Sequence, residues 1–410
     1  MRILCFDHEG GFGGSSRSLF SLIASMDRGE LDIEVWCRKS GPIVDQYQAL
    51  DIPTQTVPEL PTAAALYRLS RNFYTFGKVY LELATSKKLR HRLVDALDSD
   101  PDLIHFNNPN FAMLASHLRK RTDIPFCMHM RTSLENTYEG TSDPPLIRQL
   151  NQSSNARIAA WQTRQISSSV NHCVFITKAE EKSFRKLGGK TPGTVIHNAA
   201  DPIAEILDGD SRIPDDDRIR IAAVENYRWS RGTDRLVEIA ESLSRRGNQS
   251  ILFVVAGNMK LPRSQLNLPG DADERSDDLK SYVTNLGLEN YFCFLGSVPK
   301  PESVISKCDA VISIPRRTGP WGRNVIEAMT LGKPVIATGD GPGFVRNGEN
   351  GFFLQNFDPE IFADLLENVV GKRGDLAVLG ENARTFIAEK CDGAARAADL
   401  KAVWTGLAKK

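Results

Sequence analysis

Short apolar runs recur along the chain, and each is followed by a turn rich in Gly, Asn or Asp and then by a longer segment with helical periodicity. The run 251–256, Ile-Leu-Phe-Val-Val-Ala, is apolar at every position, as expected of a parallel strand covered by helices on both faces. The predicted strands form two series. The first series comprises residues 2–6, 33–37, 103–106, 126–130, 173–176 and 194–197, and the second comprises residues 219–224, 251–256, 291–295, 310–314 and 334–337. This pattern predicts an α/β protein with two doubly wound, Rossmann-like domains.

A stretch without sustained apolar periodicity separates the two series of strands. Residues 198–217 contain Pro202, Pro214 and the acidic run 215–217, and clusters of this kind are typical of loops. We therefore predict a domain linker here, with an N-terminal domain over residues 1–200 and a second domain over residues 201–391.

Composition narrows the class of protein further. The 410 residues contain 51 Lys and Arg and 51 Asp and Glu, so the chain lacks the net positive charge typical of nucleic-acid binders. Its seven cysteines are scattered without a C-x-x-C pair, which predicts reduced core residues in a cytoplasmic protein. The first residues have the pattern of a strand and no apolar stretch reaches 18 residues, so we expect neither a signal peptide nor a membrane span.

One segment carries most of the local charge asymmetry. Residues 66–93 contain seven Lys and Arg against the single acid Glu82, interleaved with five aromatic side chains. This composition fits a solvated helix face above a core stripe, and it also fits a peripheral patch attracted to anionic lipid. The sequence leaves both interpretations open.

The loop after the first predicted strand is rich in glycine. Residues 10–14 are Gly-Gly-Phe-Gly-Gly, and Gly13 and Gly14 open the helix that follows. Glycines allow backbone N–H groups to approach an anion closely, and a helix N-terminus adds partial positive charge. The spacing matches neither G-x-G-x-x-G nor a Walker loop. The loop therefore predicts a ligand contact without defining a nucleotide, and a merely tight strand-to-helix turn is the alternative.

A second loop combines glycine, arginine and a helix start. It follows the fourth predicted strand of the second series and leads through Gly322 into a helix. The N–H groups at that helix start are available to an anion, with Arg316, Arg317 and Arg323 as counter-charges. Glu327 lies about one turn inside the helix, where it can accept hydrogen bonds from ribose hydroxyls. A first-turn Glu favoured by the helix dipole would occupy the same position.

The next strand exit is also rich in glycine. Gly339, Gly341 and Gly343 follow the predicted strand 334–337. Two neighbouring glycine-rich loops, each with backbone N–H groups available to an anion, suit a diphosphate better than a monophosphate. The sequence therefore predicts a diphosphate ligand for the second domain.

Taken together, these blocks resemble the retaining nucleotide-sugar glycosyltransferases of family 4. Proteins of that family have the GT-B fold, in which two Rossmann-like domains face an interdomain cleft. The resemblance runs along nearly the whole chain, and the block 321–351 is its specific part. The other segments that resemble the family are residues 10–14, 104–109, 195–201 and 227–236.

The resemblance implies that the second domain binds the donor and the first domain binds the acceptor. Arg231 is expected on the diphosphate and Glu327 on the ribose, while Arg228 substitutes for a family Arg that falls on Asn226. The predicted donor-site residues are Gly13, Gly14, Arg228, Arg231, Gly322, Arg323, Glu327, Gly341 and Gly343. A helix over residues 392–410 is expected to cross back onto the first domain.

Other positions also depart from the family pattern. An acidic residue that usually contacts the donor sugar is replaced by Gly319, a His beneath that sugar by Asn107, and a common Glu by Gly343.

The catalytic candidates are Arg231, Asn107 and His129. His129 and His8 end predicted strands of the first domain and are expected to face the cleft and position the acceptor, although a strand-end His with satisfied hydrogen bonds is the alternative.

The predicted function is transfer of a sugar from a nucleoside diphosphate sugar to the hydroxyl of a glycan or lipid-linked acceptor, with retention, in surface polysaccharide or glycolipid assembly. Charge on the leaving diphosphate is stabilised by arginine and amide groups, so neither a metal nor a cofactor beyond the co-substrate is expected.

The predicted location is the cytoplasm, with peripheral contact to the inner membrane face through residues 66–93. A catalytically degenerate GT-B binding or scaffold protein and a GT-B sugar-nucleotide epimerase are the alternatives.

Overall fold

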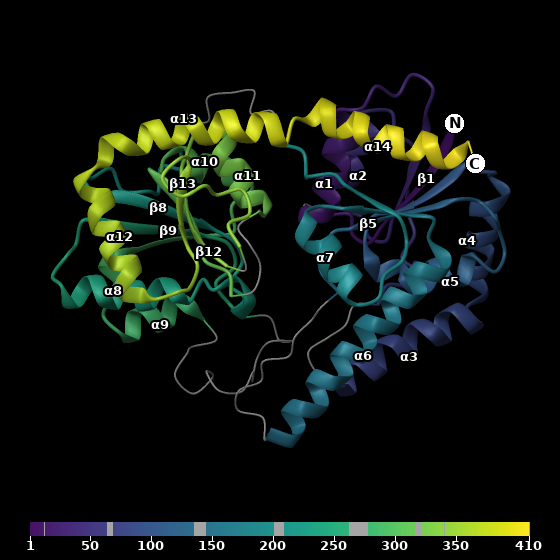
Figure 1. Ribbon diagram of the computed structural model, residues 1–410, viewed down its shortest axis with the longest axis horizontal. Helices are drawn as coiled ribbons and strands as arrows, with labels where there is room; N and C mark the ends of the chain where they lie inside the picture. The colour runs from purple at the N-terminus through teal and green to yellow at the C-terminus, as the bar shows by residue number, and fades with distance from the viewer. Residues whose placement is uncertain are drawn as a thin grey trace. The chain divides into compact units, whose positions relative to one another are not determined.

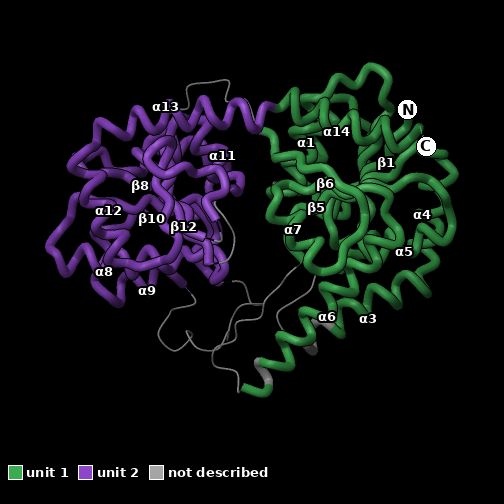
Figure 2. Tube along the Cα trace, viewed as in Figure 1, with its two compact units in different colours: residues 1–199, 393–410 green, residues 200–392 purple. Residues whose placement is uncertain are grey.

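The computed structural model divides the chain into two compact units (Figures 1 and 2). Unit 1 contains Met1–Ala199 and Gly393–Lys410, and unit 2 contains Ala200–Asp392. The structure describes residues 1–11, 13–63, 69–134, 145–200, 209–261, 278–316, 321–339 and 341–409. Part of the predicted linker, residues 201–208, and the predicted departure at Gly319 lie outside the described residues.

Unit 1 is built on a parallel sheet of seven strands in the order β3-β2-β1-β4-β5-β6-β7. The strands are β1 (Arg2–Asp7), β2 (Asp32–Cys37), β3 (Thr54–Thr56), β4 (Leu103–Phe106), β5 (Phe126–Met130), β6 (His172–Phe175) and β7 (Gly193–Val195). The helices are α1 (Gly14–Ala24), α2 (Pro42–Ala49), α3 (Leu69–Thr85), α4 (Lys87–Asp98), the 3-10 turn η1 (Pro109–Phe111), α5 (Ala112–Leu118), α6 (Pro145–Ser169), α7 (Lys178–Lys186) and the C-terminal α14 (Gly393–Ala408).

Unit 2 is built on a parallel sheet of six strands in the order β10-β9-β8-β11-β12-β13. The strands are β8 (Ile219–Val224), β9 (Ile251–Ala256), β10 (Phe292–Gly296), β11 (Ala310–Ser313), β12 (Val335–Thr338) and β13 (Gly351–Leu354). The helices are the 3-10 turn η2 (Trp229–Arg231), α8 (Arg235–Arg245), α9 (Leu279–Asn285), the 3-10 turn η3 (Glu289–Tyr291), α10 (Pro301–Ser306), α11 (Arg323–Thr330), α12 (Pro359–Gly371) and α13 (Arg373–Lys390).

Each sheet carries a hydrophobic core on both faces, which explains the runs of consecutive apolar residues. In β9, Ile251, Phe253 and Val255 belong to one core cluster, and the residues between them belong to the cluster on the other face. Successive side chains of a strand point to opposite faces, so a strand covered by helices on both sides must be apolar throughout. The predicted α/β class with two parallel sheets is therefore confirmed.

Two strands were absent from the prediction. Strand β3 has three residues, Thr-Gln-Thr, that are half-buried or exposed, and it lies at an edge of its sheet. Strand β13 is the edge strand of unit 2, and only Gly351 in it is fully buried. Edge strands are covered on fewer sides, so they lack the continuous apolar run that marks the central strands.

Helix α14 returns the end of the chain to unit 1, where it packs beside α1. Trp404 on this helix has no exposed surface, and its Nε1 donates a hydrogen bond of 3.1 Å to Nδ1 of His105 in β4. All seven cysteines are free, and only Cys293 is not fully buried. None of the described helices is both long enough and apolar enough to cross a membrane.

Candidate functional site

The strand order of unit 2 reverses between β8 and β11. From β8 the chain proceeds outward to β9 and β10, then returns to the other side of β8 with β11, β12 and β13. In open parallel sheets ligands bind at such a reversal, beyond the carboxyl ends of the strands. The loop after β8, which contains η2, and the loop after β11, which leads to α11, therefore meet at the carboxyl edge of this sheet.

Gly232 allows the two loops of unit 2 to touch. Its φ is +73°, and a Cβ atom at this position would lie 2.2 Å from the carbonyl oxygen of Ile314. The backbone N–H of Arg316 also donates to the carbonyl of Ser230 at 3.1 Å. A residue with a side chain at position 232 would clash with backbone and adopt a strained conformation.

Arg231 lies beside the start of helix α11. It is exposed, and a Cβ atom at Gly322, the N-terminal residue preceding that helix, would lie 3.9 Å from Nη1 of Arg231. No described side chain caps α11 at Gly322. The guanidinium group and the helix start thus place positive charge side by side at the reversal point, which is the arrangement that binds anions.

Arg316, expected as a counter-charge, instead holds the loops together. Its guanidinium group forms two hydrogen bonds of 2.8 and 2.7 Å to the carboxylate of Asp234, and a third of 2.6 Å to the carbonyl of Trp229. The side chains of Arg316 and Asp234 are 10% and 1% exposed. This expectation is therefore corrected: Arg316 stabilises the loop that carries Arg231, and Arg317 lies outside the described residues.

Glu327 and Arg323 form an ion pair within α11. Nε of Arg323 lies 3.3 Å from Oε1 of Glu327, and both side chains are almost fully buried. Pairing reduces the cost of burying each charge and fixes the orientation of both groups. The structure thus places two predicted donor-site residues together next to Gly322.

The glycine-rich loop after β12 lies on the same sheet edge, because β12 is the neighbour of β11. Gly341 and Gly343 have φ values of +129° and +55°, a region that favours glycine. The loop is anchored by Asn350, whose Nδ2 donates to the carbonyl of Phe344 at 3.1 Å. The structure therefore brings this second predicted loop beside the loop that contains Gly322.

Glu225 is a residue of this site that the sequence interpretation missed. It follows the last residue of β8 and is partly buried, and Oγ1 of Thr233 donates to its Oε1 at 3.5 Å. Desolvation raises the pKa of Glu225 to about 7, opposed by the charge of Arg231 and by the Thr233 hydroxyl, while Asp234 contributes to the rise. An ionisable residue directly after a buried parallel strand was the signal available in the sequence.

The strand order of unit 1 reverses between β1 and β4. Asn107 lies at this reversal, directly after the last residue of β4. Its Nδ2 donates to Oδ1 of Asp7 at 3.2 Å and to the carbonyl of Ser15 at 3.1 Å. Nε of Arg131 donates to its Oδ1 at 2.9 Å, and Nη1 of Arg131 donates to Asn198 at 2.8 Å. Asn107 has no exposed surface, and its amide links a buried carboxylate to a buried guanidinium group because it both donates and accepts.

Part of the glycine content of the loop after β1 has a packing reason. A Cβ atom at Gly10 would lie 1.8 Å from the carbonyl oxygen of Lys39, so the backbone after β1 contacts the backbone after β2 directly. Gly13 precedes α1 and Gly14 is its first residue, as predicted, and Phe12 lies outside the described residues. The ligand interpretation of this loop therefore rests on Gly13 and Gly14 rather than on its whole glycine content.

His129 differs from the expectation that it faces an open site. It lies within β5 with no exposed surface, and its ring packs edge-on against His105 at 5.6 Å. Burial, followed by the charge of Arg131, lowers the pKa of His129 well below its usual range and that of His105 to about 3. Both rings are neutral core side chains in unit 1. The nitrogens of His129 have no hydrogen-bond partner among the described residues, so this is also not the strand-end His with satisfied hydrogen bonds that the sequence allowed.

Glycosyltransferase domain models match both units. Residues 206–386 match the model described as "Glycosyl transferases group 1", and residues 13–199 match the "Glycosyl transferase 4-like domain". Together the two matches account for most of unit 2 and most of the N-terminal part of unit 1.

Individual relatives agree in class. Over 183 residues, 42% of this chain and 52% of the relative, the chain is 27% identical to the lipopolysaccharide core biosynthesis glycosyltransferase LpsE of Rhizobium meliloti. It is 26% identical to the D-inositol 3-phosphate glycosyltransferase of Corynebacterium jeikeium over 37% of this chain and 35% of that protein. The matched segments thus span about half or less of these curated relatives.

A solved structure matches nearly the whole chain. HepE from Anabaena, determined in complex with UDP and glucose, superposes with a TM-score of 0.72 at 18% identity and covers 99% of both chains. In both parallel sheets the strand order reverses at one point. Together with the match to HepE, the two sheets define a two-domain α/β protein with the GT-B fold. Since glycosyltransferase models match both of its units, the chain belongs to the glycosyltransferases of the GT-B type.

Proposed function

We propose that this chain transfers a glycosyl group from a nucleoside diphosphate sugar to a hydroxyl of a glycan or lipid-linked acceptor, with retention at the anomeric carbon, as in family 4. The observation that carries the proposal is the meeting of Arg231, the start of α11 at Gly322 and the Glu327–Arg323 pair at the reversal point of unit 2. UDP and glucose in the HepE structure support a UDP-type donor, and LpsE supports a role in surface polysaccharide or glycolipid assembly.

In the proposed reaction the residues of unit 2 stabilise the leaving group. The bond between the anomeric carbon and the diphosphate oxygen breaks, and negative charge develops on that oxygen. Arg231 and the N–H groups at the start of α11 face this charge, with Gly341 and Gly343 as further backbone contacts and Arg228 beside them. Glu327 is assigned to the ribose.

Retention requires no enzymic nucleophile in this proposal. The acceptor hydroxyl forms the new bond on the face that the diphosphate leaves, and its proton passes to the departing phosphate oxygen. We assign the acceptor to unit 1, where Gly13 and Gly14 stay predicted contacts of the donor. Asn107 acts there through the orientation of its neighbours, because its amide is already bound to Asp7 and Arg131.

Turnover with defined donors tests this function. Purified full-length protein is incubated with UDP-glucose, UDP-galactose, UDP-N-acetylglucosamine and GDP-mannose and with glycan and lipid-linked acceptors, in the presence and absence of EDTA. We expect release of nucleoside diphosphate that depends on acceptor and persists in EDTA, and NMR of the product is expected to show the anomeric configuration of the donor.

The failures of this experiment are distinguishable. A product with inverted anomeric configuration would contradict only the retaining mechanism. Loss of activity in EDTA would contradict only the expectation that the reaction needs no metal. Binding of a nucleotide sugar without turnover under any condition favours the binding or scaffold alternative. Conversion of the donor without acceptor indicates an epimerase. If calorimetry detects no nucleotide binding to the wild-type protein, the donor-site assignment is wrong.

Donor binding is expected to weaken as pH rises through about 7 because of Glu225. When protonated, this carboxyl group leaves the charge of Arg231 available to phosphate; when ionised, it competes for that charge and repels the diphosphate. The phosphates of UDP-glucose stay ionised over this range, so the pH effect reports the protein. We expect a dissociation constant about three- to tenfold larger at pH 8 than at pH 6, which corresponds to roughly 1 kcal/mol.

The same carboxyl group has a defined effect on stability. Its pKa in the folded protein lies above its ordinary value, so the stabilisation from Glu225 is complete at pH below that ordinary value and is lost as pH rises through about 7. Calorimetry of UDP-glucose binding to the wild type and Glu225→Gln tests the statement on binding, and thermal unfolding of both proteins over the same pH range tests the statement on stability. The variant is expected to bind with nearly constant affinity between pH 6 and 8, and a pH dependence equal to that of the wild type would assign the titration to another group.

A further inference from the structure

Helix α3 of unit 1 has large apolar side chains on its exposed face. Those of Phe73, Tyr74, Tyr80 and Leu81 are 72%, 73%, 70% and 60% exposed. Phe73 and Tyr80 are seven positions apart, as are the other two, so with 3.6 residues per turn all four share one face two turns long. Exposed apolar patches on otherwise well-packed proteins mark sites of interaction.

The opposite face of α3 attaches the helix to unit 1. Val79 is 3% exposed and belongs to a small core cluster, with Phe76 and Leu83 packed against it. The ring of Phe76 meets that of Trp161 in α6 edge-on, with centroids 5.7 Å apart. These side chains attach α3 to the core, whereas those of the aromatic face are mostly exposed.

Basic side chains accompany the aromatic face. Six Lys and Arg and one acid, Glu82, occur between positions 69 and 93, a net charge of +5. Lys78 lies 3.7 Å from Glu82, and Lys88 is paired with Glu59. Lys87 and Arg90, in the first turn of α4, are exposed. The combination of aromatic, leucine and basic side chains is typical of helices that lie at the surface of an anionic membrane.

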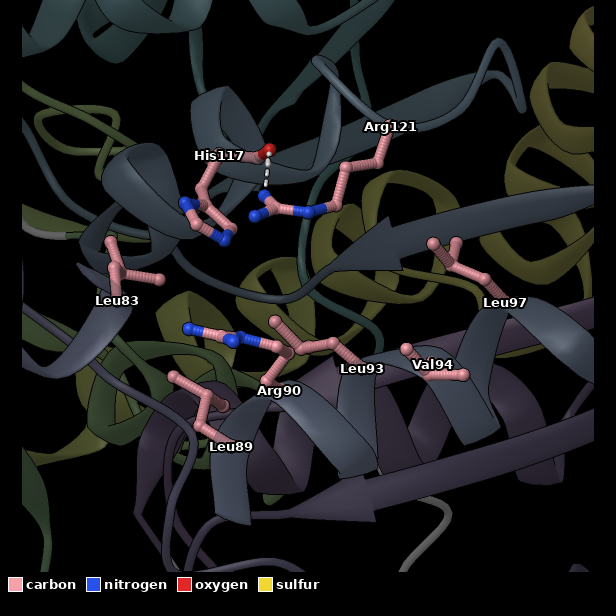
Figure 3. Close-up of a pocket in the computed structure, with 8 residues that line it drawn as sticks. All are labelled: Leu83, Leu89, Arg90, Leu93, Val94, Leu97, His117 and Arg121. Carbon is pink, nitrogen blue, oxygen red and sulfur yellow. Dashed lines mark hydrogen bonds between the residues drawn. The ribbon is translucent and has the colours of Figure 1, made fainter. Parts of the chain in front are cut away.

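A pocket beside these helices adds a second apolar surface with a basic rim (Figure 3). Its walls include Leu83 of α3 and Leu89 and Leu97 of α4, and Arg90, His117 and Arg121 also line it. Partial burial, together with the charges of Arg121, Lys120 and Arg90, lowers the pKa of His117 to about 4. An apolar wall next to two guanidinium groups suits an amphiphile with an anionic head group.

We propose that the α3–α4 surface of unit 1, defined by Phe73, Tyr74, Tyr80, Leu81, Lys87 and Arg90, docks on an anionic lipid bilayer. The aromatic and leucine side chains enter the interfacial region of the bilayer, where amphipathic rings are stable. The basic side chains contact lipid phosphate. Excess positive charge distinguishes this partner from an apolar protein surface, since charge complementarity requires an anionic partner.

Vesicle co-sedimentation of the full-length protein tests the proposal. The probes are vesicles of phosphatidylcholine alone and of phosphatidylcholine with phosphatidylglycerol. We expect at least about tenfold stronger partitioning onto the anionic vesicles at low salt, and a decrease with added NaCl because ions screen surface charge. Two double variants, Phe73→Ser with Leu81→Ser and Lys87→Glu with Arg90→Glu, are each expected to reduce partitioning at least about tenfold.

A matched control comes from unit 2. Ile361 and Val378 are 50% and 63% exposed there, so Ile361→Ser with Val378→Ser removes comparable exposed apolar area and is expected to leave partitioning unchanged. Thermal unfolding of each variant verifies that it folds.

Equal binding to neutral and anionic vesicles, or an equal loss in the unit 2 control, overturns the proposal. A wild-type dimer in light scattering that Phe73→Ser with Leu81→Ser dissociates, without vesicle binding, assigns this face to contact between copies of the chain instead. None of these outcomes depends on donor binding, so they are independent of the proposed transfer reaction.

Discussion

Arg231→Ala is expected to lower kcat/KM for glycosyl transfer by about 10²-fold or more, the usual effect of removing one donor to a developing oxyanion. Arg231 is exposed and lies beside Gly322 at the start of α11, so its guanidinium group can meet a diphosphate without rearrangement of the core. Because the side chain is exposed, the substitution is expected to change the free energy of unfolding by no more than about 0.5 kcal/mol. Steady-state kinetics and thermal unfolding measure the two effects.

The control for this prediction is Arg245→Ala. Arg245 belongs to the same unit, its side chain is 63% exposed, and it pairs with Glu360 at the end of α8 away from the reversal point. Its removal is expected to leave kcat/KM unchanged. Arg231→Lys preserves charge without the forked geometry, so intermediate activity is expected. Turnover by Arg231→Ala at the wild-type rate would exclude Arg231 from the reaction.

Asp234→Ala is expected to destabilise the protein by about 3 kcal/mol, because it leaves the guanidinium group of Arg316 buried without its carboxylate. The two side chains are 1% and 10% exposed and share two hydrogen bonds. Urea unfolding followed by tryptophan fluorescence is suited to the measurement, since Arg316 stacks 4.8 Å from the ring of Trp229. Donor affinity is expected to fall as well, because the loop that carries Arg231 loses its anchor.

Two further variants distinguish the loss of the buried Asp234–Arg316 pair from the general effect of removing a charged side chain. Asp364 also pairs with an arginine, Arg246, but the two side chains are 62% and 27% exposed, so Asp364→Ala is expected to cost about 0.5 kcal/mol or less. The double variant Asp234→Ala with Arg316→Met removes both buried charges and is expected to recover part of the lost stability. A cost for Asp234→Ala no larger than that for Asp364→Ala contradicts the assigned role of the pair.

The central strands could be predicted because burial on both faces leaves a continuous apolar signature. Strand β9, with six consecutive buried residues, is found at the predicted bounds 251–256. Strand β3, Thr-Gln-Thr, could not be predicted, because its hydrogen bonds to β2 hold an edge strand without apolar residues. Edge pairing depends on the neighbouring strand more than on the strand's own composition.

For the site, the positions of loops could be predicted better than the partners of side chains. Gly322, Glu327 and Arg323 lie together as expected from adjacency along one helix. The assignment of Arg316 as a free counter-charge was wrong, because Asp234, 82 positions earlier, takes its guanidinium group. His129 ends up in the core because the strands of unit 1 place it against His105.

The sequence by itself determined that this chain has two parallel α/β units and that glycine-rich loops follow their strands, because burial periodicity and backbone freedom are properties of neighbouring residues. Only the tertiary structure decided that Arg316 is paired with Asp234 while Arg231 is exposed, and that the charge of Arg231 acts on the pKa of Glu225. The physical reason is that the pKa and the partners of a charged group depend on which distant loops the sheet order brings together.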